Sequence, residues 1–141
     1  MRLLHTKTYE LKEFFEDQIP EYVILSHRWG EDEVSFKEFR KGLKKASTGY
    51  MKIMQCCAFA RSHARDWVWI DTCCIDKRSS AELSESINSM WSYYSNTREC
   101  YAYLVDVPSL AHGMTSVLWR LQQSDWVRVV PHDPSHSMSG F

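Results

Sequence analysis

Three short apolar runs, separated by stretches of helical periodicity, constrain the fold of this chain most. The runs are YVIL at Tyr22–Leu25, WVWI at Trp67–Ile70 and CYAYLV at Cys100–Val105, and all three are rich in β-branched or aromatic side chains. Nearly continuous apolarity over so few residues is typical of strands that are covered on both faces, as in a parallel sheet. Each run therefore predicts a buried strand.

The stretches between these runs place apolar residues at helical spacing. The first pattern begins at Phe36, and the second runs from Tyr50 to about Ala64. A third stripe comprises Leu83, Ile87, Met90, Trp91 and Tyr94. Strand, two helices, strand, helix, strand is the order of an α/β fold in which helices flank a parallel sheet. The residues MRLL at Met1–Leu4 are expected to add a short strand.

Polar and aromatic residues follow the first two predicted strands directly. The segment Ser26–Asp32 leaves the first strand, and Asp71–Lys77 leaves the second. In parallel sheets, ligands and interaction surfaces gather beyond the carboxyl ends of the strands, where the connecting loops begin. We therefore expect both segments to lie along one edge of the sheet, with Trp29 and Asp71 on the same side of the molecule.

Composition limits the class of protein and its partners. A length of 141 residues suits one domain. The formal net charge of −1 gives the chain no positive electrostatic field that would attract nucleic acid or an anionic membrane. No apolar run approaches the ~20 residues of a membrane span, and the charged N-terminus lacks a signal-peptide core, which predicts a cytoplasmic protein. The five cysteines show no C-x-x-C spacing, so we expect buried thiols, with no metal site and no cofactor.

The loop after the first strand contains four candidate ligand-binding residues. Ser26, Trp29 and Gly30 could line a nucleotide pocket, because an indole stacks on a base or ribose and a glycine allows close backbone approach or a positive φ. The alternative is a tight turn in which Trp29 covers the core. Arg28 is a candidate for bidentate phosphate contact, and an ordinary solvated loop is its alternative.

Three carboxylates near the second strand are the remaining candidates. Asp71 and Asp76 bracket the loop after that strand and could bind ribose hydroxyls or a cation, or could equally accept hydrogen bonds from backbone N–H groups of the turn. Glu82 could act as a catalytic carboxylate. However, Ser79 stands three residues before it, which is the spacing of a capping box at a helix start, and we favour the capping role.

Aromatic residues are concentrated around the second strand and the third helical stripe. We expect them to pack in the core and to cover the sheet, with any exposed subset forming a surface for self-association. They are Trp67, Trp69, Trp91, Tyr93 and Tyr94.

Several short motifs at fixed separations make the chain resemble the fungal heterokaryon-incompatibility (HET) domain. They are Leu25-Ser26 with Trp29-Gly30, Trp69-Ile70-Asp71 with Cys74-Ile75-Asp76, and the single residues Glu82, Met90 and Tyr94. The resemblance runs from Met1 to about Val107. It implies a Toll/interleukin-receptor (TIR) or flavodoxin-like fold and a role in fungal non-self recognition and programmed cell death.

The resemblance also implies two alternative activities. Some TIR domains cleave NAD at the nicotinamide ribosyl bond with a glutamate on the helix after the third strand, and others are scaffolds that self-associate. HET domains usually continue with a segment like S-x-W-F-x-R-G-W-T-L-Q-E-L. In this chain Ser124 and Trp126 match, but the pattern then ends, and no glutamate follows Glu99.

This departure leads us to expect a truncated, non-catalytic, self-associating module, with NAD hydrolysis as the alternative. The fold is expected to be incomplete at its C-terminus. We divide the chain into an N-terminal part of a HET domain at 1–107, a divergent helical segment at 108–128 with a short helix near 116–123, and a polar, disordered tail at 129–141.

Overall fold

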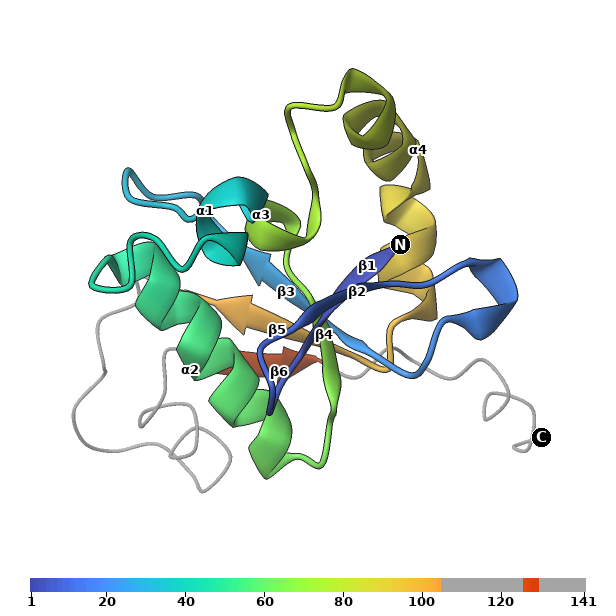
Figure 1. Cartoon of the computed structure of the whole chain (residues 1–141). Coiled ribbons are helices and arrows are strands. Elements are labelled where there is room, and N and C mark those ends of the chain that lie inside the picture. The colour runs from blue at the N-terminus through green and yellow to red at the C-terminus, as the bar shows by residue number, and fades with distance from the viewer. Residues whose placement is uncertain (105–125, 130–141) are drawn as a thin grey trace.

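The computed structural model of the chain describes residues 1–104 and 126–129, the latter only as backbone. Within these residues the protein is a single mixed sheet with helices packed against it (Figure 1). The helix expected near 116–123 lies outside the described residues, as does the tail expected at 129–141 except for its first residue, Val129, which belongs to a strand.

The sheet has six strands in the order β2-β1-β4-β3-β5-β6. The strands are β1 (Arg2–His5), β2 (Leu11–Glu13), β3 (Val23–His27), β4 (Trp67–Trp69), β5 (Glu99–Tyr103) and β6 (Trp126–Val129). The three predicted apolar runs form the adjacent strands β4, β3 and β5, and these pair in parallel as expected.

The prediction of a parallel sheet is wrong for the outer strands. β1 pairs antiparallel with both β2 and β4, and β6 pairs antiparallel with β5. For β1 and β2 the reason is the short connection Thr6–Glu10, since only antiparallel strands can be joined by a tight hairpin. Strand β6 was not predicted, because the sequence suggests the end of a helical segment there.

All three predicted helical patterns form helices, and one further short helix follows β4. The helices are α1 (Phe36–Arg40), α2 (Thr48–Ser62), α3 (Asp71–Cys74) and α4 (Ser80–Asn96), with a 3-10 turn η1 (Glu16–Gln18) after β2. α3 was not predicted because four residues are too few to show a helical period.

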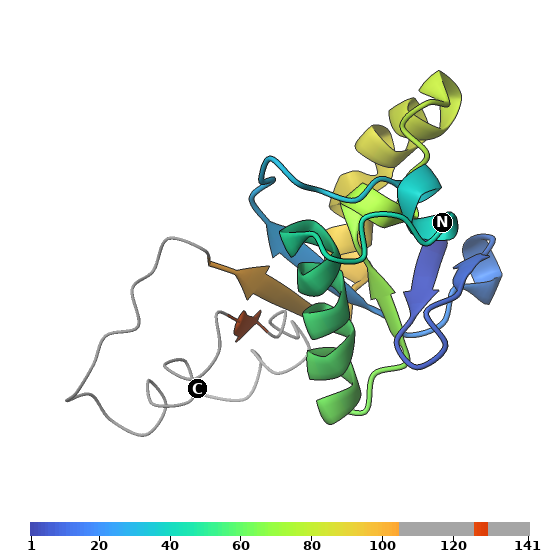
Figure 2. The ribbon, with the colours of Figure 1, turned by 60° about the vertical axis from the view of Figure 1, so that its left-hand side comes forward.

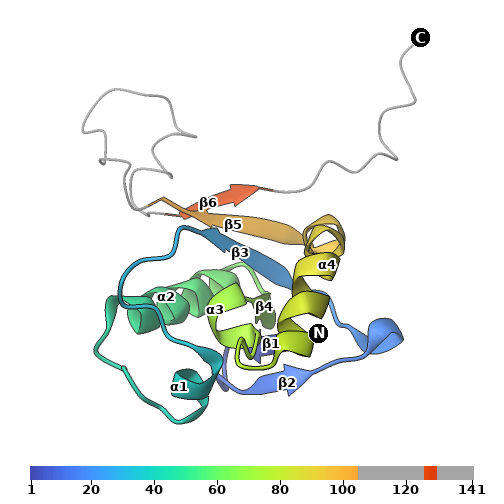
Figure 3. The ribbon, with the colours of Figure 1, turned by 90° about the horizontal axis from the view of Figure 1, so that it is seen from above.

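The two long helices cover opposite faces of the sheet. In the register of the central strands, Ile24 lies beside Trp69 and Cys100, whereas Tyr101 belongs to the other face because side chains alternate along a strand. The ring of Phe59 on α2 lies 4.9 Å from that of Tyr101. On the opposite face, Trp69 packs against α4, and Figures 2 and 3 show the two helices on different sides of β3.

The sheet and helices enclose one hydrophobic core. Its residues come from every central strand and from both sides of the sheet, with Val23, Ile24, Val68 and Ile70 fully buried. Cys56, Cys57, Cys73 and Cys74 are buried thiols, as the sequence predicts, whereas the fifth cysteine, Cys100, is a half-buried thiol. Burial is the main cause that raises the pKa of the Cys57 thiol, to about 12.

Helix α4 packs less of its surface than its sequence suggests. Leu83, Met90 and Tyr94 pack against the core, but Ile87 and Trp91 are 59% and 84% exposed. Trp91 therefore does not cover the sheet, and it belongs to the exposed subset of aromatic residues that the sequence left open. The helix contacts the sheet along a narrow line, so residues on the edge of the stripe turn toward solvent.

Serine caps begin each of the longer helices. Ser79 caps α4 by accepting the backbone N–H of Glu82, which confirms the predicted cap. The Glu82 side chain, however, does not complete a capping box. The reciprocal arrangement occurs instead at Ser35 and Glu38, at the start of α1, where backbone and side-chain hydrogen bonds from Ser35 are the leading causes that lower the pKa of Glu38 to about 2.

The start of α2 packs directly on the backbone of the loop that precedes α1. A Cβ atom added at Gly49 would lie 2.8 Å from the Cα atom of Glu33 and closer still to the carbonyl oxygen of Asp32. Only a glycine allows this approach. At Gly30, by contrast, the nearest atom would be 3.7 Å away and φ is not positive, so the close approach or positive φ expected at Gly30 is absent.

Replacement of Gly49 by alanine should destabilise the fold. Alanine gains helix propensity, but the backbone atoms it meets cannot move cheaply, and overpacking of this kind costs about 1–3 kcal/mol. Chemical denaturation monitored by circular dichroism measures the change. Gly30→Ala is the matched control and should stay within about 0.5 kcal/mol of the wild type. Equal stability of the two variants would contradict the close packing.

Candidate functional site

The carboxyl ends of β3 and β4 bring the two predicted loop segments together. Because the strands are parallel neighbours, His27 at the end of β3 and Asp71 at the start of α3 lie side by side. The His27 Nε2 and Asp71 Oδ1 atoms are 2.8 Å apart, and the Trp29 indole N–H donates to Asp71 Oδ2 at 2.8 Å. The expectation that Trp29 and Asp71 share one edge of the sheet is confirmed.

Asp71 holds the indole of Trp29 in a defined orientation. The Lys77 ammonium donates to the Asp71 backbone oxygen at 2.6 Å and lies 4.5 Å from the Trp29 ring centroid, over its face. The His27 side chain is 1% exposed, and its Nδ1 atom has no hydrogen-bond partner among the residues that the structure describes. The Asp71 carboxylate and the Lys77 ammonium thus hold the loop after β3 against the end of β4.

The same contacts set the charge of Asp71. Burial by itself would raise the pKa of this carboxyl group, but the hydrogen bonds from His27 and Trp29 and the charges of His27 and Lys77 outweigh it and lower the pKa. The carboxylate therefore stays ionised at neutral pH. Both of its oxygens contact side chains, His27 through Oδ1 and Trp29 through Oδ2, which is neither the ribose or cation site nor the backbone N–H role that the sequence left open.

A cavity of about 440 Å³ opens next to this cluster, between the loop after β3 and the start of α2. Three of the predicted residues, Arg28, Trp29 and Gly30, contribute to its wall. The complete lining comprises Arg28, Trp29, Gly30, Glu33, Thr48, Gly49, Lys52 and Tyr103. Lys77 does not line the cavity. The part of the Trp29 indole that faces the cavity is therefore not the part that the Lys77 ammonium covers.

The other predicted site residues do not line this cavity. Ser26 lies near Tyr94 of α4, on the face of the sheet away from α2, and its interaction with the Tyr94 hydroxyl opposes the rise in the Tyr94 pKa that burial causes. Asp76 pairs with Arg78 through two side-chain contacts of 2.9 and 2.8 Å and accepts the Arg78 backbone N–H. Asp76 therefore takes the turn role that the sequence left open.

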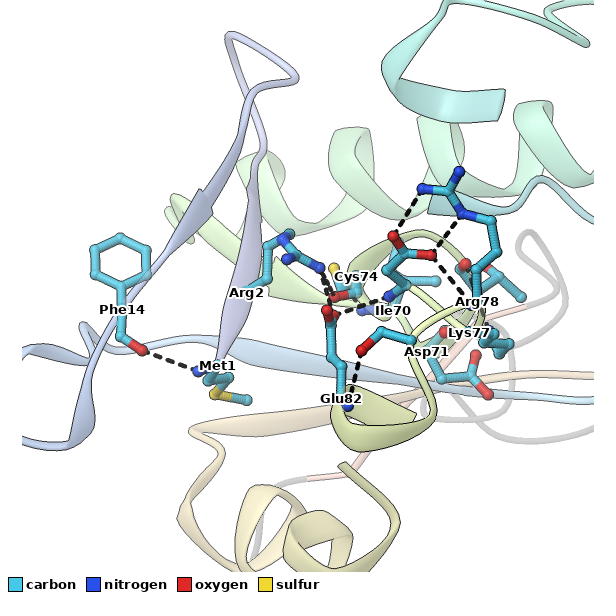
Figure 4. Close-up of polar contacts among 12 residues, drawn as sticks. Met1, Arg2, Phe14, Ile70, Asp71, Cys74, Lys77, Arg78 and Glu82 are labelled. Atoms are coloured by element: carbon cyan, nitrogen blue, oxygen red, sulfur yellow. Dashed lines mark hydrogen bonds and ion pairs between the residues drawn. The ribbon is translucent and has the colours of Figure 1, made fainter. Parts of the chain in front are cut away.

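Glu82 lies in a separate polar cluster at the N-terminal end of α4 (Figure 4). Its Oε1 atom pairs with Arg2 at 2.6 Å and accepts the Asp76 backbone N–H at 2.8 Å. Arg2 also donates to the carbonyl oxygen of Cys74. Glu82 thus joins β1, the loop after α3 and the start of α4, and the structure does not bring it to the cavity.

Sequence reasoning missed the ion pair inside the cavity. Lys52 of α2 and Glu33 of the loop pair directly, with side chains only 7% and 13% exposed. One signal was present in the sequence, since Lys52 lies one and two helical turns before Cys56 and Ala60, on the apolar face of α2. A lysine in such a stripe indicates a buried charge with a partner.

Among residues 1–104 and 126–129, no group of three or more His, Cys, Asp or Glu side chains is arranged to hold a metal ion. In that same part of the chain, no helix combines the length and apolar character needed to cross a bilayer.

Comparison with known proteins identifies the family. The model of the family described as "Heterokaryon incompatibility protein (HET)" matches residues 22–138. The chain belongs to the heterokaryon-incompatibility family. The match covers most of 1–107 and extends through the segments 108–128 and 129–138, and the division into these three segments stays a prediction.

One curated relative in this family is the vegetative incompatibility protein HET-E-1 of Podospora anserina. The two are 45% identical over 114 residues, which is 77% of this chain but 8% of HET-E-1. The chain therefore spans less than a tenth of the length of this relative. No solved structure matches the chain.

Replacement of Asp71 by asparagine should destabilise the domain in a pH-dependent way. The folded-state pKa of Asp71 is lowered, so its stabilisation is present above the ordinary carboxyl pKa of about 3.9 and is lost as the pH falls through the folded-state value. We expect a loss of about 1–3 kcal/mol at pH 7 that shrinks toward pH 3.

Urea denaturation at several pH values measures this difference between variant and wild type. Asp66→Asn is the matched control, because Asp66 is an exposed aspartate paired with an exposed lysine, Lys7. A gap between wild type and the Asp71 variant that is as large at pH 3 as at pH 7 would show that the charge of Asp71 contributes nothing.

Proposed function

We propose that this chain is a signalling module that self-associates in fungal non-self recognition and promotes programmed cell death without catalysis. Membership of the heterokaryon-incompatibility family and the similarity to a vegetative incompatibility protein support the biological role. The absence of a glutamate after Glu99 in these 141 residues supports the non-catalytic form. The observation that carries self-association is the exposed apolar surface of α4.

This surface consists of Ile87 and Trp91, which are one helical turn apart on α4. Trp91 is 84% exposed, and tryptophan is enriched among the few residues that carry most of the binding energy of protein interfaces. The partner we propose is a second copy of this chain, with two such helices packing about a twofold axis so that each Trp91 covers the other Ile87. The net charge of −1 offers little repulsion between copies.

Loss of the apolar groups from this surface should weaken self-association. We expect the wild-type chain to form dimers or larger species in light scattering after size exclusion, and Trp91→Ser to be monomeric at the same concentration. Because the residue is exposed, the substitution should change stability by no more than about 0.5 kcal/mol.

Phe15→Ser is the matched control, since Phe15 is an exposed aromatic residue (69%) outside α4 and should leave the assembly unchanged. Expression in fungal cells extends the test: wild type and Phe15→Ser should stop growth, whereas Trp91→Ser should not. A wild-type chain that stays monomeric at high concentration would contradict the proposal.

A second candidate function is hydrolysis of NAD in the cavity next to Trp29. The observation in its favour is that Arg28, Trp29 and Gly30, which the sequence suggested for nucleotide binding, line one cavity. The carboxylate in that cavity is Glu33, and Glu82 lies outside it. For this function, therefore, Glu33 replaces Glu82 as the residue to test.

Nicotinamide release from NAD separates the two candidate functions. Hydrolysis in this cavity should fall by about 100-fold in Glu33→Gln and persist in Glu82→Gln, because Glu33 lines the cavity and Glu82 does not. Release no greater than that of a protein-free blank excludes the second function and agrees with the first. Release that depends on Glu82 instead would place the reaction elsewhere on the molecule.

A further inference from the structure

The Lys52 side chain is buried, which is rare for a lysine. Its side chain is 7% exposed, at the wall of the cavity beside Trp29, and its ammonium lies 5.8 Å from the centroid of the Tyr103 ring. A buried ammonium is costly unless an anion compensates it. Glu33 supplies that anion from the loop between β3 and α1.

The Glu33 carboxylate makes the contacts that a bound anion would make at this place. Its Oε1 atom pairs with Lys52 and also accepts the backbone N–H of Gly30 at 2.8 Å. Its Oε2 atom is buried and has no hydrogen-bond partner in the described part of the chain. Glu33 therefore satisfies this site with one of its two carboxylate oxygens, although both can accept hydrogen bonds.

The start of α2 forms the adjoining wall of the same cavity. Thr48 and Gly49, the first two residues of this 15-residue helix, line it. The backbone N–H groups of a first turn have no partner within their own helix and carry the positive end of its dipole. The N–H of Tyr50 is taken by the Ser47 hydroxyl at 3.1 Å, and Thr48 and Gly49, the two residues before Tyr50, line the cavity.

We propose that Glu33 is an internal occupant of an anion site, and that the phosphate group of a small aromatic phosphate ester displaces it. A phosphate carries up to two charges and three free oxygens, so it matches Lys52 and the first turn of α2 better than one carboxylate does. Trp29 and Tyr103 give the cavity flat aromatic walls for the organic part of the ligand. Glu31 and Asp32 next to Glu33 are exposed, so the displaced carboxylate has solvent to enter.

This site does not depend on NAD turnover or on self-association. A chain that binds a phosphate ester but releases no nicotinamide refutes only the second candidate function. A chain that dimerises through α4 but does not respond to phosphate refutes only the anion site.

Calorimetric titration of the wild-type chain and three variants tests the inference, with phenyl phosphate, inorganic phosphate and phenol as the probes. Glu33→Gln keeps an acceptor for the Gly30 N–H but removes the competing charge, so phenyl phosphate should bind about tenfold tighter than to the wild type. Lys52→Met should abolish binding. Glu31→Gln, a neighbouring exposed acid, is the matched control and should behave as the wild type does.

The probes separate the parts of the ligand. Phenyl phosphate should bind more tightly than inorganic phosphate, and phenol should not bind. Equal affinity for the two phosphates, or binding of phenol alone, would overturn the assignment of an aromatic phosphate ester.

Amide chemical shifts in the wild-type chain keep the inference testable if the Glu33 variant does not fold. Phenyl phosphate should shift the backbone N–H signals of Thr48 and Gly49 and leave those of the exposed end of α4 unchanged. An unchanged Gly49 signal at saturating ligand, or equal affinities of folded Glu33→Gln and wild-type chains, would overturn it.

Discussion

The contact between Asp71 and the loop after β3 organises this end of the molecule. Parallel pairing of β3 with β4 brings the two strand ends within reach, and Asp71 then binds His27 and Trp29 at 2.8 Å each. Without this carboxylate, the loop would lose its connection to β4 and the indole its fixed orientation. The adjoining cavity follows from that arrangement, because Trp29 is one of its walls.

One buried charge pair lies at the amino ends of the parallel strands and another at their carboxyl ends, and the two differ in how fully the carboxylate is hydrogen-bonded. At the amino end of β5, Glu99 is 1% exposed, pairs with Arg65 at 2.6 Å and accepts the Tyr101 hydroxyl at 3.1 Å. Both of its carboxylate oxygens are thus engaged. At the carboxyl end of β3, Glu33 engages one oxygen with Lys52 and Gly30, and its other oxygen has no partner within residues 1–104. The first pair ties strand to loop, whereas the second stands in a cavity and is the more easily replaced by a ligand.

Much of the central architecture could be predicted because it depends on apolar periodicity. Continuous apolar runs need cover on both faces, and this requirement alone places β4, β3 and β5 in the middle of the sheet. The outer strands could not be predicted as antiparallel, since β2 is a three-residue strand with little apolar pattern. In the candidate site, Arg28, Trp29 and Gly30 were identified from their position after a strand, whereas Glu33 and Lys52 belong to segments far apart in the sequence and meet only in the folded chain.

The sequence by itself determined the α/β class, the family, the serine cap of α4 and the meeting of Trp29 with Asp71, because each depends on local pattern or strand direction. Only the tertiary structure decided which acids are structural, that Gly49 rather than Gly30 is required by close packing, and that Trp91 faces solvent. These outcomes depend on which surfaces touch after the helices settle on the sheet. Spacing along a helix predicts which residues share a face. The width of the face that becomes buried depends on the elements that pack against it.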